Sequence, residues 1–219
     1  MFESLESRRL LSATFTFADG TKVVQGGGGL TVSSGSLNTN IALVENLNGV
    51  DGDHSVDVFN NNTFEHTEFF GVYGTIKVAG GAGTDRIVVD TTTLQIDVSG
   101  GEGDDVITIS DLSATGGDKV DAGGGNDRII LVASASSTLN GAGGDDTFDI
   151  NTGAIHQTFV WDYDGTNTVI NGGGGDDIFN IYAGDGSVNG AGGTDVLIDY
   201  TGNAVSNFTT KNVETVIDL

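Results

Sequence analysis

Six aspartates recur at one position of a repeated glycine-rich pattern, and carboxylates at a regular spacing can bind cations. Each aspartate follows a glycine turn, and glycine tolerates the positive φ that lets a tight turn aim its carbonyls inward. The six copies read VAGGAGTDRIVV (78–89), VSGGEGDDVITI (98–109), VDAGGGNDRIIL (120–131), LNGAGGDDTFDI (139–150), INGGGGDDIFNI (170–181) and VNGAGGTDVLID (188–199). Their shared aspartates are Asp85, Asp105, Asp127, Asp146, Asp177 and Asp195. A repeated unit of this kind determines the whole fold.

The elements that must position these aspartates are short strands. Successive aspartates are 20, 22, 19, 31 and 18 residues apart, which suits coils of two strands and two turns. After each turn, apolar residues alternate with others, so that Ile129 and Leu131 lie on one face of a strand. The set expected to face inward is Val78, Ile87, Val89, Val98, Ile107, Ile109, Val120, Ile129, Leu131, Leu139, Phe148, Ile150, Ile170, Phe179, Ile181, Val188 and Leu197. Asp199 breaks this series, so we expect the stack to end there.

Stacked coils would bring the aspartates close together. Paired strands are about 4.8 Å apart, and carboxylates at that spacing repel one another. A hard cation between coils would remove the repulsion, and Ca²⁺ accepts 6–8 carboxylate and carbonyl oxygens in flexible geometry. Zinc and copper favour His or Cys, which these turns lack. The sequence therefore predicts calcium along one edge and leaves a site between Asp146 and Asp177 open because of the 31-residue step.

The copies resemble the glycine-rich nonapeptide G-G-x-G-x-D-x-U-x of RTX proteins, over residues 78–199. The resemblance implies an all-β, parallel β-roll with calcium between successive turns. The family's aspartate falls on the six aspartates above. The fourth-position glycine is Gly83, Gly103, Gly125, Gly144, Gly175 and Gly193, and the residue before the aspartate is Thr84, Asp104, Asn126, Asp145, Asp176 and Thr194. Departures are Ala122 at the first glycine and Ala142 and Ala191 at the second.

Composition excludes several function classes. The 219 residues contain 31 acidic and 8 basic side chains, a formal net charge of −23, so binding to phosphate backbones is excluded. The absence of cysteine excludes disulfides and thiolate metal sites. No apolar run reaches the roughly 18 residues that would predict a membrane span. The 36 glycines and absence of proline suit many tight turns between strands.

The rest of the chain divides into three segments. Residues 1–13 resemble the LEPR-XLL tag of exported bacterial surface proteins, through Leu5, Glu6, Arg8, Leu10 and Leu11, with Ser7 in place of the usual proline. The tag implies an extracellular or cell-surface location. Residues 14–77 contain short period-two bursts, which predict degenerate coils or a small β cap. Residues 78–200 form the predicted roll, and 201–219 contain a closing strand at 213–219.

We therefore expect a non-enzymatic, calcium-stabilised β-roll with a structural or adhesive role. One alternative is a carbohydrate- or matrix-binding module that uses exposed aromatic residues, although burial is favoured for them. These residues are Phe69, Phe70, Tyr73, Trp161 and Tyr163. Another is a β-helical polysaccharide-active enzyme with a cleft between residues 40–77 and 151–168, where Glu65 or Asp162 would act.

Other polar motifs are weaker. Asp162–Asn167 is similar to the start of an EF-hand loop, and Asp51–Asp53 is weaker still, so ordinary turns are favoured for both. The pair Asp104 and Asp105 could imitate a glycosidase dyad, but its recurrence favours metal coordination. Three scattered histidines, His54, His66 and His156, form no zinc or catalytic motif.

Overall fold

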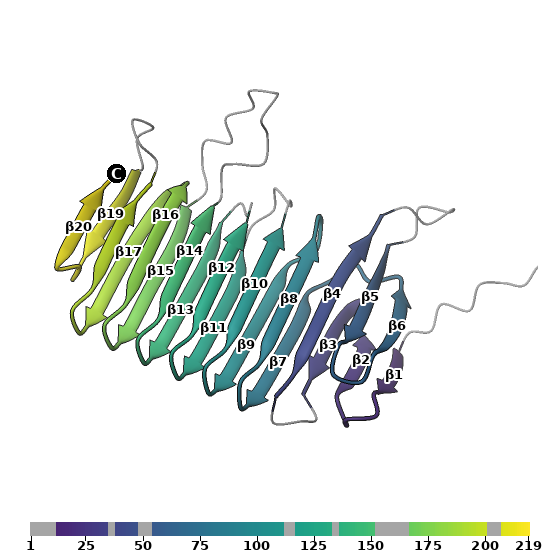
Figure 1. The fold of residues 1–219 in the computed structure, drawn as a ribbon. Helices are drawn as coiled ribbons and strands as arrows, with labels where there is room; N and C mark the ends of the chain where they lie inside the picture. The colour runs from purple at the N-terminus through teal and green to yellow at the C-terminus, as the bar shows by residue number, and fades with distance from the viewer. Residues whose placement is uncertain are drawn as a thin grey trace, which may run out of the picture.

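The protein is a β-solenoid made of two ten-stranded sheets that face each other across one core (Figure 1). The computed structural model describes residues 12–34, 38–47, 54–111, 117–132, 136–151, 167–200 and 207–219. Every regular element in these ranges is a strand, so the predicted all-β fold with parallel stacked coils is confirmed.

The strands alternate between the sheets along most of the chain. In the first sheet the order is β1 (Ser12–Thr16), β2 (Lys22–Gly26), β3 (Gly29–Ser33), β7 (Ile76–Ala82), β9 (Ile96–Glu102), β11 (Asp118–Gly124), β13 (Ser137–Gly143), β15 (Asn167–Gly174), β17 (Asp185–Gly192) and β19 (Asn207–Lys211). In the second sheet it is β20 (Thr215–Asp218), β18 (Val196–Asp199), β16 (Ile178–Ala183), β14 (Thr147–Asn151), β12 (Arg128–Val132), β10 (Val106–Asp111), β8 (Arg86–Thr91), β4 (Asn40–Asn46), β5 (Ser55–Asn60) and β6 (Glu65–Phe70).

The coils stack in register, which aligns equivalent residues of every copy. Ile107 pairs with Ile87 on one side and Ile129 on the other, and Val120 pairs in the same way with Val98 and Leu139. All the aliphatic and aromatic residues predicted to face inward are in the buried core. The alternation of apolar and polar residues therefore specifies the register, because a one-residue slip would expose the whole apolar set.

The N-terminal part combines one solenoid coil with an antiparallel cap, the two structures between which the sequence left the choice open. Strands β3 and β4 pair in parallel with β7 and β8 and begin the stack. Strands β1 and β2 pair antiparallel with each other, β2 with β3, β4 with β5, and β5 with β6. This cap lies at the end of the stack (Figure 1), and it covers the edges of the first coil in both sheets, which would otherwise offer unpaired backbone groups.

One expectation about the far part of the stack was wrong. The stack does not end at Asp199, because β19 and β20 add a further coil paired in parallel with β17 and β18. The stack also continues across the 31-residue step, since β13 pairs with β15 and β14 with β16. Strand β14 ends and β15 begins at the edge opposite the glycine turns, so the longer connection between them leaves the repeated turns aligned (Figure 1).

Candidate functional site

The six repeated aspartates form a buried row along one edge of the solenoid. Each lies in the turn that joins a strand of the first sheet to the next strand of the second. Their relative exposure is only 0–2%. We call this set, Asp85, Asp105, Asp127, Asp146, Asp177 and Asp195, the aspartate row.

One oxygen of each carboxylate is used by the neighbouring coil. The amide of Asp85 donates to Oδ1 of Asp105 at 2.8 Å, and the amide of Asp105 donates to Oδ1 of Asp127 at 2.7 Å. The same bond continues along the row as Asp127 to Asp146 (2.8 Å), Asp146 to Asp177 (2.8 Å) and Asp177 to Asp195 (3.0 Å). Thr39 donates to Asp85 at the start, and Glu214 accepts from Asp195 at the end. Oδ1 therefore links each coil to the next.

The other oxygen, Oδ2, has no hydrogen-bond partner in any of the six aspartates, and it is buried. It points at the first glycine of its own turn: a Cβ built on Gly80 would lie 2.5 Å from Oδ2 of Asp85 and 2.5 Å from the carbonyl oxygen of Gly100. The equivalent contacts recur at Gly100, Gly141, Gly172 and Gly190. In these coils a carboxylate oxygen and the next coil's carbonyl thus border one space, which we call the turn space.

The first and second glycines of the motif have different physical roles. The second has positive φ, as at Gly81 (106°) and Gly101 (121°), whereas the first does not. Ala142 and Ala191 occupy the second position with φ of 75° and 74°, and their coils keep the common register. The first glycine therefore provides room, and the second provides backbone conformation.

The residues before the row form a second ladder on the outside of the same turns. The amide of Asn126 donates to Oδ1 of Asp104 at 2.8 Å, and the amide of Asp145 to Oδ1 of Asn126 at 2.9 Å. Asp176 and Thr194 continue the series at 2.9 and 2.7 Å. These bonds run back along the stack, whereas those of the row run forward. The exposed Asp104 and the buried Asp105 thus accept hydrogen bonds from coils on opposite sides of their own.

Burial perturbs the carboxyl groups of the row. Loss of hydration, with the charges of neighbouring aspartates, raises the pKa of Asp105 and of Asp177 to about 6 and that of Asp146 to about 7. Burial also raises the pKa of Asp85 and of Asp127. Hydrogen bonds from backbone amides oppose these shifts but do not cancel them. The row therefore carries a charge that the fold alone does not stabilise.

The chemistry of the row suits a hard cation. Its available donors are Oδ2 and backbone carbonyl oxygens, with no nitrogen or sulfur, as Ca²⁺ prefers. Among the described residues, no three His, Cys, Asp or Glu side chains come together to hold a metal, so carbonyls would have to complete any site. The fourth-position glycines, Gly83, Gly103, Gly125, Gly144, Gly175 and Gly193, all have positive φ in these turns.

No protein-family model, curated protein or solved structure matches this chain. Function must therefore be argued from the row and its surroundings. No helix among the described residues is long and apolar enough to cross a membrane.

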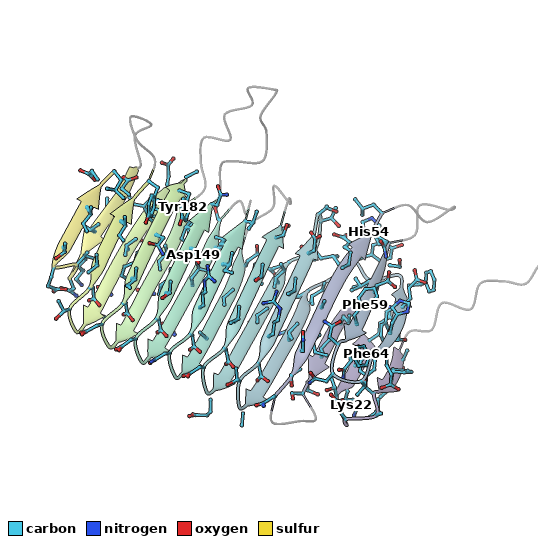
Figure 2. The ribbon with its side chains drawn as sticks, viewed as in Figure 1. Lys22, His54, Phe59, Phe64, Asp149 and Tyr182 are labelled. Carbon is cyan, nitrogen blue, oxygen red and sulfur yellow. The ribbon has the colours of Figure 1, made fainter. Side chains whose placement is uncertain are left out.

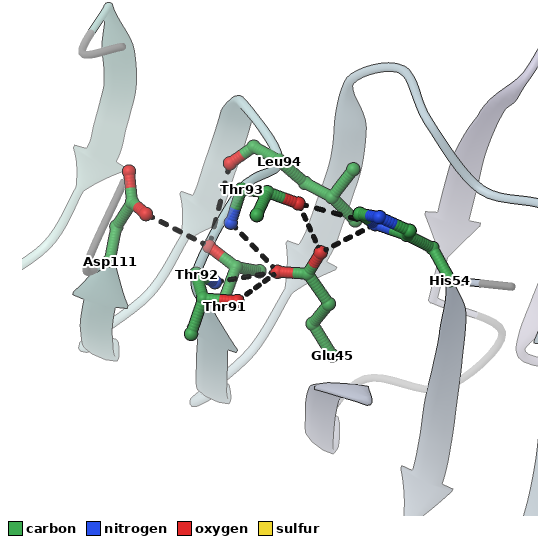
Figure 3. Close-up of polar contacts among 7 residues, drawn as sticks. All are labelled: Glu45, His54, Thr91, Thr92, Thr93, Leu94 and Asp111. Atoms are coloured by element: carbon green, nitrogen blue, oxygen red, sulfur yellow. Dashed lines mark hydrogen bonds and ion pairs between the residues drawn. The ribbon is translucent and has the colours of Figure 1, made fainter. Parts of the chain in front are cut away.

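Outside the aspartate row, the buried carboxylate of Glu45 accepts several hydrogen bonds (Figure 3). Its Oε2 accepts from the amides of Thr92 (2.5 Å) and Thr93 (2.9 Å), and its Oε1 accepts from the Thr93 hydroxyl. His54 contacts Oε1 at 3.2 Å and the Thr93 hydroxyl at 3.3 Å through the same atom, Nδ1. These contacts join the turn between β8 and β9 to Glu45 on β4.

The other predicted candidates are dispersed. His66 contacts Asp57 at 2.9 Å and stacks on Phe59 with the ring centroids 4.7 Å apart. Glu65 accepts from the amide of Ala18 at 2.7 Å and joins the two parts of the cap. The expected burial is confirmed for Phe69 but wrong for Phe70 and Tyr73, which are 62% and 52% exposed. Residues 1–11, Asp51–Asp53, His156, Trp161, Asp162, Tyr163 and the rest of 152–166 lie outside the described residues.

Two features of the second sheet's outer face were missed in the sequence. Asp149 pairs with Arg128 at 2.6 Å and accepts from Asn180 at 2.9 Å, which ties three coils together (Figure 2). Tyr182 stacks on Tyr200 with ring centroids 4.7 Å apart. The register pairs Asp149 with Asn180 and with Ile130, which lies two residues beyond Arg128 on the same face of β12, so the repeat spacing was a signal that could have revealed this cluster.

Proposed function

We propose that this chain binds Ca²⁺ along the aspartate row, and that calcium stabilises a structural or adhesive module outside the cell. The observation that supports this most strongly is the set of six buried Oδ2 atoms that lack a hydrogen-bond partner. Leaving a buried carboxylate oxygen without a partner costs roughly 1–3 kcal/mol or more. A cation bound at a turn would supply the missing partner there.

The residues that would hold the ion are one aspartate of the row per coil together with backbone carbonyls of the adjacent turn. The carbonyl of Gly100 borders the same space as Oδ2 of Asp85, and in the last motif the carbonyl of Asn212 takes the equivalent place beside Asp195. Bound calcium would neutralise stacked carboxylates whose repulsion opposes compaction of a chain with net charge −23. In this role the protein is not an enzyme.

A location outside the cell suits this role. Extracellular modules bind Ca²⁺ with dissociation constants of about 10⁻⁴–10⁻³ M, so a row of that affinity would fill only in a calcium-rich medium. The LEPR-XLL resemblance of the N-terminal residues points to the same compartment. A partner in the matrix or a polysaccharide would fit an adhesive role.

Thermal unfolding followed by circular dichroism tests the proposal. The chain is stripped with EGTA and heated alone, with 5 mM CaCl₂ (about five times the weak end of that affinity range), or with 5 mM MgCl₂. We expect calcium to raise the midpoint clearly and magnesium to raise it much less, because Mg²⁺ demands near-ideal octahedral geometry. Identical midpoints in all three buffers would overturn the proposal.

A further inference from the structure

The third repeat differs from the other five at the turn space. In five copies the first-position residue is a glycine, and an added Cβ would meet Oδ2 of the aspartate in the same turn. In the third copy this residue is Ala122 on β11. Its neighbours Asp121 and Gly123 pair with Ser99 and Gly101 on one side and with Asn140 and Ala142 on the other, so Ala122 takes the place of Gly100 and Gly141 in the stack. Ala122 is 0% exposed, so its methyl group lies inside the roll.

The hydrogen-bonded ladder does not require glycine at this position. Asp127, in the same turn as Ala122, accepts the amide of Asp105 at 2.7 Å and remains 2% exposed, like its equivalents in the glycine-containing turns. The backbone does not require glycine either, since the first-position glycines lack positive φ. The close approach of Oδ2 and the next carbonyl to the first glycine in the other five turns is therefore not required by the fold.

We propose that Ala122 excludes the cation from the third turn, so that the row binds calcium in two separate groups. One group lies at Asp85 and Asp105, and the other lies at Asp146, Asp177 and Asp195. The methyl group of Ala122 keeps Oδ2 of Asp127 and the carbonyl of the next coil from approaching as closely as the equivalent oxygens do beside the first glycine of the other five turns, where the two oxygens could share an ion. This inference rests on the proposed function, because it assigns which turns of the row are filled.

The carbonyl of Ala122 remains available to the second turn. A Cβ built on Gly100 would lie 2.5 Å from this oxygen. The carbonyl and the side chain of Ala122 thus act on different turns: the carbonyl serves the turn of Asp105, and the side chain blocks the turn of Asp127. A substitution of the side chain alone should change one site and leave its neighbour intact.

Counting bound ions tests the inference. The full chain is first stripped of metal. It is then dialysed to equilibrium against increasing CaCl₂, in buffer with about 0.15 M KCl to screen loosely held counterions. The dialysis gives the number of ions bound per chain at saturation. Ala122→Gly should bind one more calcium ion than the unaltered protein. Gly100→Ala, which places a methyl group in the turn of Asp105, should bind one fewer.

Ala142→Gly is the matched control. It makes the same chemical change one coil further on, at the second-glycine position, where the residue is exposed and φ is 75°. It should leave the ion count unchanged, because its methyl group does not enter the turn space.

The outcomes separate the two proposals. Equal counts in the unaltered protein, Ala122→Gly and Gly100→Ala would overturn the role of Ala122 while leaving calcium binding in place. Absence of bound calcium in the unaltered protein would overturn the proposed function itself. If Ala122→Gly fails to fold by circular dichroism in calcium, Gly100→Ala decides alone: one ion fewer supports the inference, and an unchanged count contradicts it.

Discussion

The backbone amide of Asp146 donates a 2.8 Å hydrogen bond to Oδ1 of Asp177, a residue 31 positions further along the chain. The bond from Asp127 to Asp146 spans 19 positions and has the same length. The row is thus insensitive to the length of the connection between coils, because the register of β13 with β15 and of β14 with β16 sets its geometry. Each coil can therefore be altered and measured separately.

The two oxygens of Asp146 can be separated by substitution. Asp146→Asn keeps an oxygen that accepts from the amide of Asp127. It replaces the unpartnered oxygen with an NH₂ group, which can donate to the nearby carbonyl of Gly172. Without calcium at pH 7.5, we expect the asparagine variant to gain about 1–3 kcal/mol in free energy of unfolding. Asp146→Ala should lose a similar amount, since the buried amide of Asp127 then has no partner. Urea unfolding in EGTA measures both.

The Asp146→Asn variant also tests whether the row serves only to accept hydrogen bonds from the backbone amides of neighbouring coils. If it does, Asp146→Asn should leave the response of the protein to calcium unchanged. Our account predicts a smaller calcium-induced rise in midpoint for this variant than for the unaltered chain. A full response in the asparagine variant would argue against an ion at this coil.

The metal-free protein should lose stability as pH rises. The pKa values of about 6 for Asp105 and Asp177 and about 7 for Asp146 lie above the ordinary value of 3.8. The folded state therefore binds more protons than the unfolded state between these values, and stability falls as pH increases from about 4 to 7.5. Unfolding midpoints in EGTA across this range measure the slope, which Asp146→Asn should make shallower. A midpoint that rises steadily to pH 7.5 would contradict these shifts.

Glu45 should show the opposite dependence on pH. Burial alone would raise its pKa, but hydrogen bonds from Thr93 and Thr92 outweigh this and lower it below 4.5. Its contribution is therefore present above the unfolded pKa and is lost as the pH falls through the folded value. Glu45→Ala should cost about 1–3 kcal/mol at pH 7, because it leaves the amides of Thr92 and Thr93 without their acceptor. Denaturant unfolding with and without calcium should give the same loss.

The core should respond to truncation in the ordinary way. Phe148 and Phe179 are fully buried and stack with ring centroids 5.0 Å apart and planes at 19°. Phe179→Ala should cost about 3–5 kcal/mol, through lost burial and the cavity that remains. Phe70→Ala, at a 62% exposed position, serves as the control and should change stability by less than about 0.5 kcal/mol. Comparable losses in both variants would contradict the assigned core.

Much of the fold could be predicted from the sequence, because the same alternation of apolar and polar residues recurs in every copy of the motif. Ile107, Ile129 and Phe148 occupy the same position of successive copies, so strand periodicity and repeat spacing placed them together in the core. The last coil was not predicted because β19 reads NFTTK, without the glycines and aliphatic residues of the motif. There Glu214 replaces the aspartate, and a longer side chain reaches the amide of Asp195 across a shorter turn.

The site was predictable in its residues but not in its detail. The repeated aspartates indicated oxygen ligands at one edge, and the structure places all six in one buried row. The hydrogen bonds of the two ladders run in opposite directions along the stack. The sequence did not predict this for adjacent residues such as Asp104 and Asp105, because the direction depends on which neighbouring coil each side chain faces. Positive φ accounts for the second glycine, and only the contacts of Oδ2 revealed that the first provides space.

Calorimetric titration of CaCl₂ into the metal-free chain tests the central claim most directly. Our account predicts saturable heat of binding by more than one ion, at millimolar or lower calcium, which is reduced in Asp105→Asn and in Asp177→Asn. Heat no greater than that of dilution, in a chain that is fully folded in chelator, would contradict it and leave the aspartate row as a purely structural ladder.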